Sequence, residues 1–322
     1  MGQTLSEPVT TKDTAAGEDE ALAWAVSNMQ GWRISMEDAH QMILDLEGNS
    51  KSDEKTALFA VFDGHGGSEA AKFAAKRLHL ALAGLDSYKA GDYRQALKDA
   101  FLKTDTDFFT EVDGDPSGCT AVAALLKAPK QIYVANAGDS RSVLGLKGEA
   151  KPMSFDHKPG NKDENARIVA AGGFVEFGRV NGNLALSRAI GDAEFKRNSS
   201  LSAETQIVTA DPEIIVHDVT GEEEFLVLAC DGIWDCLSNQ QVVDFVRRGI
   251  AQGKELTTIC EEIMTHCLAP DSEIGGVGCD NMTFSVVAML GGRTKEQWYS
   301  WVKERVEKKI GWDTPEEIAP VF

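Results

Sequence analysis

Four aspartates in this chain stand where an apolar, strand-like segment meets a loop. They are Asp63 in FAVFDGHGG, Asp139 in YVANAGDSR, Asp231 in FLVLACDGIWD and Asp280 in GCDNMTFSVVAML. A strand end is a rigid mounting point, and one rim of a sheet can direct several side chains to a common point. Because carboxylate oxygens are preferred ligands of hard divalent cations, the four aspartates together predict a Mg²⁺ or Mn²⁺ site.

Each of these motifs also has a purely structural interpretation. Asp-Gly and Asp-Asn pairs are common in turns, so Asp231, Asp235 and Asp280 could each serve only a loop. The stretch DGHGG (63–67) taken alone could equally be a glycine-rich turn with an incidental histidine. The recurrence of all these motifs at the ends of apolar segments favours a common site.

Further residues suit a metal site that handles phosphate. The glycines that follow Asp63 let the backbone approach a ligand and free a carbonyl for a metal, and His65 could deliver a proton. In SNMQGWRISMEDAH, Arg33 can hold a phosphate through two parallel hydrogen bonds, since its guanidinium is a planar fork. Glu37 and Asp38 would ordinarily be a solvated pair, and the neighbouring motifs favour placing them in the site.

Eight motifs occur in the order found in metal-dependent protein phosphatases of the 2C type. They are MQGWRISMEDAH, FAVFDGHGG, SGCTAVAALL, VANAGDSR, FDHKP, VNGNLALSRAIGD, LACDGIWD and CDNMTFSVV. The sequence resembles this family over about residues 22–291 and looks like a eukaryotic member, with a fungal one as the narrower expectation. The resemblance implies an α+β fold, in which two antiparallel β-sheets form a central sandwich flanked by α-helices in α/β/β/α layers.

The resemblance also implies a centre of two metal ions, Mg²⁺ or Mn²⁺, at one rim of the sandwich. Asp63 would bridge both ions, and the Gly64 carbonyl would bind one of them. Asp231 and Asp280 would bind the other. Asp139 matches the ligand of a third, weaker ion.

The remaining matching residues would handle water and phosphate. By resemblance, Glu37 and Asp38 act largely through metal-bound waters, Arg33 holds the phosphate and His65 is the general acid. A metal-bridged hydroxide would then attack phosphoserine or phosphothreonine in line, without a covalent phosphoenzyme. A CxxxxxR loop with a cysteine nucleophile is absent from the sequence, in agreement with that mechanism.

Other parts of the motifs are interpreted mainly as structural or peripheral. These include Thr120, His157 and Arg188. Residues 160–179 are expected to supply a surface flap that shapes the choice of protein substrate.

The elements that must position these residues follow from the pattern of apolar runs. Strands are predicted at 22–28, 40–46, 57–62, 119–126, 131–136, 142–146, 207–209, 213–217, 224–230 and 282–290. Helices are predicted at 67–84, 92–111, 162–171, 239–250 and 254–268. Ser238 and Gln241 have the form of a capping box. Because several strands are consecutive, the pattern favours antiparallel sheets with helices packed outside over a βαβ fold.

Three segments are expected along the chain. Residues 1–21 are predicted to be a flexible lead, 22–291 the catalytic domain and 292–322 a helical tail. In the tail, Trp298 and other apolar residues recur at helical spacing, which indicates a helix that docks on the domain or, alternatively, binds a partner. The start MGQTLS fits the pattern for myristoylation of Gly2, a weak match that gives only marginal membrane contact.

Composition limits the remaining function classes. The net charge of −19 argues against nucleic acid as a partner, because binding it requires a cationic surface. Six cysteines without a CxxC pair indicate reduced thiols in an intracellular protein, in the cytoplasm or nucleus. No apolar run is long enough to span a membrane. We expect a monomer that acts on phosphoproteins.

Two other functions remain open on the sequence alone. One is a catalytically inactive scaffold on the same fold, although such relatives typically lose metal-binding aspartates and this chain keeps Asp63, Asp231 and Asp280. The other is a metal-dependent hydrolase of small phosphoesters, which only relative rates on protein and small substrates would distinguish. A protein serine/threonine phosphatase is the function that we expect.

Overall fold

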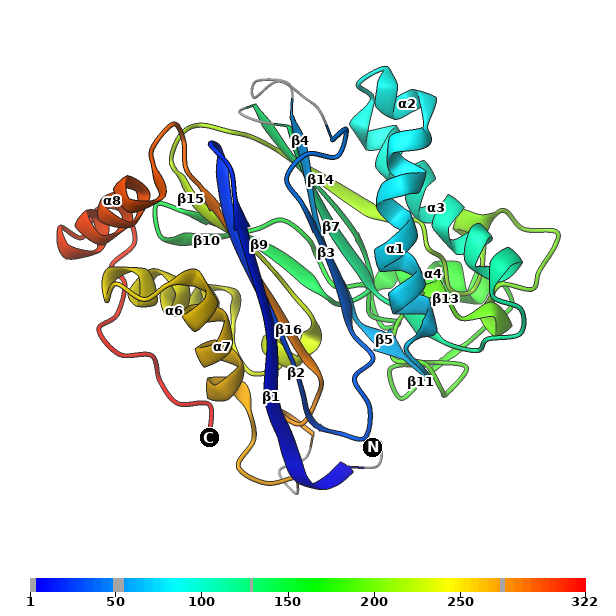
Figure 1. Cartoon of the computed structure of the whole chain (residues 1–322). Coiled ribbons are helices and arrows are strands. Elements are labelled where there is room, and N and C mark those ends of the chain that lie inside the picture. The colour runs from blue at the N-terminus through cyan, green and yellow to red at the C-terminus, as the bar shows by residue number, and fades with distance from the viewer. Residues whose placement is uncertain (1–3, 49–54, 128–129, 273–275) are drawn as a thin grey trace.

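The computed structural model describes residues 4–48, 55–127, 130–272 and 276–322, and two antiparallel β-sheets stacked face to face form its centre (Figure 1). Within these residues, one sheet has six strands in the order β1-β2-β16-β15-β9-β10 and the other has five in the order β14-β8-β7-β4-β3. The strands of the first sheet are β1 (Thr4–Glu18), β2 (Leu22–Arg33), β16 (Met282–Met289), β15 (Glu223–Ala229), β9 (Arg141–Leu146) and β10 (Glu149–Pro152). Those of the second are β14 (Glu213–Asp218), β8 (Gln131–Ala137), β7 (Ala121–Lys127), β4 (Thr56–Phe62) and β3 (Ala39–Ile43).

Helices cover the outer face of each sheet. The five-stranded sheet packs against α1 (Glu69–Gly84) and α3 (Tyr93–Glu111). The six-stranded sheet packs against α6 (Asn239–Ala251), α7 (Leu256–Cys267) and α8 (Lys295–Glu307), on the opposite side of Figure 1. The predicted α+β fold with α/β/β/α layers is therefore confirmed.

Central strands face two different cores, which explains their continuous apolar sequences. In β4, Phe59 and Val61 pack between the sheets, whereas the alternate residues Leu58, Ala60 and Phe62 pack under α1 and α3. Successive side chains of a strand point to opposite faces, so both sets are buried. Each fully buried Phe or Val side chain stabilises the fold by roughly 1.5–3 kcal/mol.

Two helix starts are defined by local hydrogen bonds. The capping box predicted at Ser238 and Gln241 is present before α6, and Thr294 with Gln297 forms another before α8. Such caps satisfy backbone N–H groups that have no partner within the helix, and typically contribute about 1 kcal/mol each.

The prediction of a flexible lead over residues 1–21 is wrong for most of that segment. Thr4–Glu18 forms β1, which pairs antiparallel with β2 from Thr4 opposite Arg33 to Glu18 opposite Ala23. Its composition is polar because β1 is an edge strand with mostly exposed side chains. Backbone pairing with β2, together with contacts such as Thr14 Oγ1 to Glu261 at 2.7 Å, holds it in place.

Smaller elements differ from the prediction. Strand β10 was not predicted, and 207–209 forms no strand beyond an isolated bridge from Thr209 to Arg188. A short helix, α5 (Asp231–Trp234), begins directly at one of the predicted metal-binding aspartates. Short α2 (Asp86–Lys89) follows α1.

The C-terminal helix α8 docks on the domain. Trp298 is fully buried, and its Nε1 donates a hydrogen bond to the Glu224 carbonyl at 3.0 Å. Val302 also packs into the core shared with α6 and α7. The docking interpretation of the helical pattern is confirmed.

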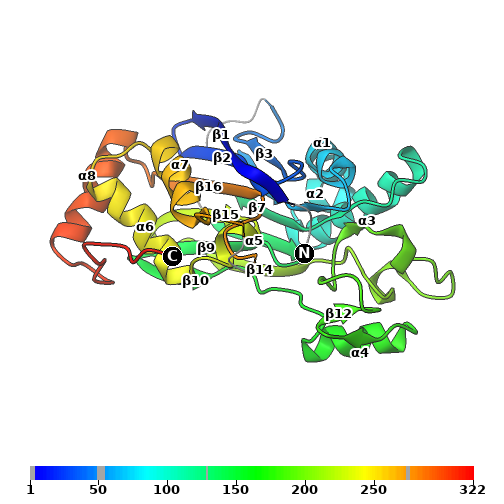
Figure 2. The same cartoon turned by 90° about the horizontal axis from the view of Figure 1, so that it is seen from below.

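A small lobe extends from the sandwich between β10 and β14. It contains α4 (Lys162–Ala170) and the hairpin β11 (Val175–Glu176) and β12 (Arg179–Val180), which project from the body in Figure 2. The lobe has its own apolar cluster, in which Ile168, Val180 and Phe195 are buried. It is a packed unit and not only a surface loop.

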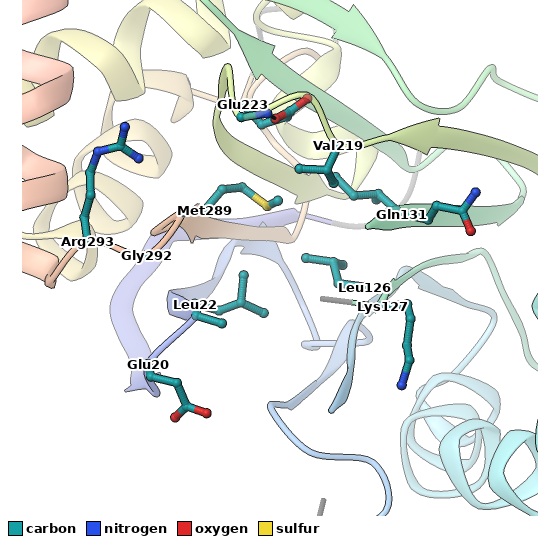
Figure 3. Close-up of a pocket in the computed structure, with 14 residues that line it drawn as sticks. Glu20, Leu22, Leu126, Lys127, Gln131, Val219, Glu223, Met289, Gly292 and Arg293 are labelled. Carbon is teal, nitrogen blue, oxygen red and sulfur yellow. Dashed lines mark hydrogen bonds between the residues drawn. The ribbon is translucent and has the colours of Figure 1, made fainter. Parts of the chain in front are cut away.

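The two ends of the sandwich differ in chemistry. At the end where β2 begins and β16 ends, an apolar pocket of about 320 Å³ opens between the sheets. Leu22, Leu126 and Met289 point into it, with charged Lys127 and Arg293 at its margins (Figure 3). The opposite end is lined with carboxylates. No helix among the described residues combines the length and apolarity that crossing a membrane requires.

Candidate active site

The four aspartates singled out in the sequence lie at the carboxylate-lined end of the sandwich. Asp63 follows β4, Asp139 follows β8, Asp231 follows β15 and Asp280 precedes β16. Oxygen atoms of Asp63, Asp139 and Asp231 all lie within 4.8 Å of one another. The two sheets therefore contribute jointly to one acidic cluster.

Asp38 joins this cluster from the segment between β2 and β3. One of its oxygens also lies within 4.8 Å of Asp63 and of the Cys230 sulfur. Asp38 Oδ2 accepts a hydrogen bond from Thr283 Oγ1 at 2.7 Å. Its Oδ1 is buried and has no hydrogen-bond partner in the part of the chain that the structure describes. A buried carboxylate oxygen without a donor fits a position beside a cation.

The electrostatics of the cluster favour a bound cation. Burial raises the pKa of Asp63 and Asp231 well above the usual aspartate value, and neighbouring carboxylates raise both further. Burial likewise raises the pKa of Asp38 to about 6, with Asp280 adding to the shift. A divalent cation would offset the cost of holding these groups ionised close together.

Gly64 occupies a position where no side chain fits. A Cβ atom there would lie 2.2 Å from the Glu37 carbonyl oxygen, so glycine is required for the close approach of two backbone segments. Glu37 itself is held by two hydrogen bonds. It accepts from Ser35 Oγ at 2.8 Å and from the Gly67 N–H at 3.2 Å.

Arg33, at the end of β2, lies against Asp280. Arg33 Nη2 is 2.5 Å from Asp280 Oδ2, and both side chains are partly exposed. Asn281 fixes the surrounding loops, because its Nδ2 donates to the carbonyls of Gln30 and Ser35 at 2.8 and 2.9 Å. The Asn281 Oδ1 accepts from the Glu37 N–H at 2.9 Å. The guanidinium is thus held at the mouth of the acidic cluster.

His65 forms an ion pair with Asp192, a residue that the sequence did not single out. His65 Nε2 lies 2.7 Å from Asp192 Oδ2. Burial alone would lower the pKa of His65, but the charge and hydrogen bond of Asp192 reverse the effect, so the pKa is raised. A Cβ on Gly118 would lie 2.2 Å from Asp192 Oδ2, so glycine in the SGCTA motif makes room for this pair.

Asp139 is paired with a lysine. Lys158 Nζ contacts Asp139 Oδ2, and the Asp139 side chain is almost fully buried. Burial raises the pKa of Asp139 while Lys158 acts in the opposite direction. An ammonium group therefore occupies one side of the carboxylate that the sequence associates with a third, weaker metal ion.

An open cavity of about 410 Å³ lies over these residues. Asp63, Asp231 and Asp280 line it, as do Arg33 and His65. One wall comes from the lobe and the segment that follows it: Arg179, Asn183, Leu184, Ala185, Leu186, Asp192, Glu194 and Phe195. Gly64, Gly66, Pro116, Thr120 and Asp139 also line the cavity. Of the predicted flap at 160–179, only Arg179 reaches the cavity, because most of that segment forms α4 and the hairpin.

Comparison with known proteins agrees with this arrangement. The family model described as "Protein phosphatase 2C" matches residues 22–274. The chain belongs to the protein phosphatase 2C family. Family members are metal-dependent protein-serine/threonine phosphatases, and this chain is an enzyme of that class. The match ends before Asp280 and β16, which the fold places in the same sandwich.

Individual relatives support the family assignment. The chain is 56% identical to "Protein phosphatase 2C homolog 2" of Hypocrea jecorina, over 99% of this chain and 74% of that protein. It is 54% identical to the "Protein phosphatase 2C homolog 2" of Schizosaccharomyces pombe, over 99% and 87%. A solved phosphatase from Toxoplasma gondii has the same fold, with a TM-score of 0.73 and 24% identity over 87% of this chain and 96% of that one.

The structure brings together at this end of the sandwich the residues predicted to bind metal and phosphate: Arg33, Glu37, Asp38, Asp63, Gly64, His65, Asp139, Asp231 and Asp280. Their roles stay predictions. Thr120, His157 and Arg188 were interpreted mainly as structural or peripheral, and each makes hydrogen bonds to neighbouring protein groups. Thr120 Oγ1 accepts from the Asp63 N–H and bonds to Ser140, and His157 Nδ1 accepts from the Gly138 N–H. Arg188 donates to the Glu164 carboxylate and to the Asp211 carbonyl. Thr120 nonetheless lines the cavity. The residues missed are Asp192, Lys158 and Asn281. Each stands inside a quoted motif, which was the only signal available in the sequence.

Proposed function

We propose that this chain hydrolyses phosphoserine and phosphothreonine in proteins with two divalent ions held by Asp63, Asp231, Asp280 and the Gly64 carbonyl. The observation that supports this most is the carboxylate cluster, where the pKa of Asp63 and Asp231 is raised by burial and by repulsion between neighbouring carboxylates. An oxygen-only ligand set accepts Mg²⁺ or Mn²⁺. Glu37 and Asp38 would hold water molecules of the ions, since their own hydrogen bonds keep them at the border of the cluster.

The chain's own side chains then act on the phosphate. Ions bound here would lower the pKa of a water molecule and neutralise phosphate charge. Arg33 would bind the phosphate oxygens through its forked N–H groups, leaving its contact with Asp280 to do so. His65 would donate its proton to the departing serine or threonine oxygen. Asp192 favours the protonated imidazole and fixes the orientation of the ring.

The surroundings of the cavity favour a protein substrate. The cavity is open on one side, and the hairpin beside it exposes Phe177 at its tip, with 94% of the residue accessible. Phe174 is also exposed and apolar. Arg179, on the same hairpin, lines the cavity and offers a cation to acidic residues near the phosphorylated one. The net charge of −19 opposes nucleic acid as a partner.

We further propose that Asp139 holds a third, weaker ion in competition with Lys158.

We take residues 22–291 as the catalytic domain, with β1 and α8 packed on it. We also propose a monomer that works in signalling in the cytoplasm or nucleus, consistent with six free cysteines. Gly2, the possible myristoylation site, lies outside the described residues.

Metal binding and turnover measured together would test this function. The variant Asp231→Asn removes one ligand, and Asp86→Asn is a matched control because Asp86 is fully exposed on α2. Mn²⁺ binding by calorimetry and phosphate release from a phosphothreonine peptide should be normal in Asp86→Asn. Both should be strongly reduced in Asp231→Asn. Near-normal turnover of Asp231→Asn at ordinary metal concentration would contradict the assigned site.

A further inference from the structure

Two cysteines lie in contact where the turn after α5 meets the end of α7. Cys236 Sγ lies 3.5 Å from the Cys267 carbonyl oxygen, so the two residues are in direct contact. Cys236 stands between α5 and α6, and Cys267 is the last residue of α7. All six cysteines of the chain lie in described residues, and among them Cys236 alone is partly exposed, whereas the other five are buried. One partner is therefore accessible to small solutes and the other is adjacent to it.

The pair is mechanically connected to two of the metal-binding loops. The turn that carries Cys236 is hydrogen-bonded to the residues at and after Asp231. The Asp235 N–H donates to the Asp231 carbonyl at 2.8 Å, and Cys236 Sγ contacts the Gly232 carbonyl at 3.5 Å. On the other side, the Ala269 N–H, two residues after Cys267, donates to the Gly278 carbonyl at 2.9 Å. Gly278 is two residues before Asp280. A covalent link between the cysteines would pull on both loops.

We propose that Cys236 and Cys267 are a peroxide-oxidisable pair whose disulfide reversibly lowers the phosphatase activity. Cys236 is the attacking sulfur because it is the accessible one, and Cys267 resolves the intermediate. In support, the neighbouring Cys267 side chain is the largest cause of a lowered pKa at Cys236, while burial opposes it. A thiolate is the reactive form of cysteine towards peroxides.

The chemistry balances with hydrogen peroxide as the oxidant. The Cys236 thiolate attacks one peroxide oxygen, the O–O bond breaks, and the departing hydroxide takes up a proton to leave as water. The Cys267 thiol then loses its proton and attacks the sulfenic sulfur, and the S–O bond breaks to release a second water. The cysteines lose two electrons and the peroxide gains them. A dithiol reverses the reaction by exchange.

The structural consequence follows from the length of the new bond. A disulfide draws the two sulfurs to about 2.05 Å, well inside the separation of unbonded sulfur atoms, so its formation would shift the turn between α5 and α6. A metal ligand displaced by on the order of 1 Å can cost about a hundredfold in rate. We therefore expect oxidation to lower turnover by about tenfold to a hundredfold, as Asp231 moves with its turn.

Peptide mapping and activity after oxidation would test the proposal. The reduced full-length chain, freed of metal with a chelator, is treated with hydrogen peroxide, quenched with catalase and alkylated. Digestion without reductant should yield one linked peptide pair that contains Cys236 and Cys267. Activity with restored Mg²⁺ should fall in parallel and return after dithiothreitol.

Variants separate this pair from the other cysteines. Cys236→Ser should abolish the linked peptide and keep its activity after peroxide, whereas Cys260→Ser, buried inside α7, should behave like the wild type. A linkage of Cys236 to Cys279, no linkage at all, or equal inactivation of wild type and Cys236→Ser would overturn the proposal. The map requires no variant and no activity, so its result is independent of the proposed function.

Discussion

Replacing Asp38 with asparagine should stabilise the metal-free protein at neutral pH while weakening metal binding. The carboxylate accepts one hydrogen bond, from Thr283, and its other oxygen is buried without a partner among the described residues. Burial, with a contribution from Asp280, raises its pKa to about 6. An asparagine keeps an acceptor for Thr283 and carries no charge, so it removes the cost of ionising this group.

The size of the effect follows from the pKa. The rise from 3.8 to about 6 corresponds to about 3 kcal/mol at about 1.4 kcal/mol per pH unit. Because the folded-state pKa is the higher one, the stability linked to this group is fully present below about pH 4. It is lost as the pH rises through about 6 and is constant above that. The asparagine variant has no such loss, so its advantage should grow from near zero at about pH 4 to about 3 kcal/mol at pH 7.

Urea unfolding in chelator, followed by tryptophan fluorescence across this pH range, measures the advantage directly. The measurement is then repeated with saturating Mn²⁺, which should stabilise the wild type more than Asp38→Asn because bound ligand adds to stability. The reasoning is refuted if Asp38→Asn is no more stable than the wild type at pH 7 in chelator. A stability difference that does not vary with pH would refute it equally.

Three further predictions concern individual residues. Arg33→Ala should raise KM for a phosphopeptide by roughly tenfold to a hundredfold, because the charge-assisted hydrogen bonds to the phosphate are lost. An unchanged KM would show that Arg33 does not bind the phosphate. Asp192→Asn should lower the pKa of His65, so the alkaline limb of the pH dependence of kcat should move to lower pH. Substrates with poor leaving groups should be slowed more than p-nitrophenyl phosphate. An unchanged pH dependence would argue against a role for the His65–Asp192 pair. Lys158→Met should tighten Mn²⁺ binding at Asp139 by about tenfold or more, because the ammonium group that competes for the carboxylate is removed. An electron paramagnetic resonance titration measures this, and unaltered binding would show that Lys158 does not compete.

The centre of the fold could be predicted because its strands are buried on both faces. The sequence of β4 and the later part of β15 are apolar runs followed closely by an aspartate, so each strand and its candidate metal ligand could be predicted together. Capping residues marked the helix starts in the same local way, as at Ser238. Local composition therefore sufficed where burial or a cap imposed it.

Features that depend on distant partners could not be predicted. Strand β1 contains Pro8 and several charges, and only its register with β2 makes it a strand. Asp192 adopts a left-handed backbone conformation, with φ of 54°, and meets His65 across 127 residues of sequence. Lys158 reaches Asp139 through the folding of the segment after β10. Nothing in the local sequence of these residues indicates the partner that the fold provides.

Phosphate release from phosphoserine, phosphothreonine and phosphotyrosine peptides tests the central claim most directly. The chain is assayed with Mg²⁺, with Mn²⁺ and with chelator, beside Asp63→Asn, which removes the carboxylate shared by both groups of ligands. We expect metal-dependent release from phosphoserine and phosphothreonine that chelator and the substitution both abolish. Release that persists in chelator or in Asp63→Asn, or none from any peptide by a folded protein that binds metal, would contradict the account.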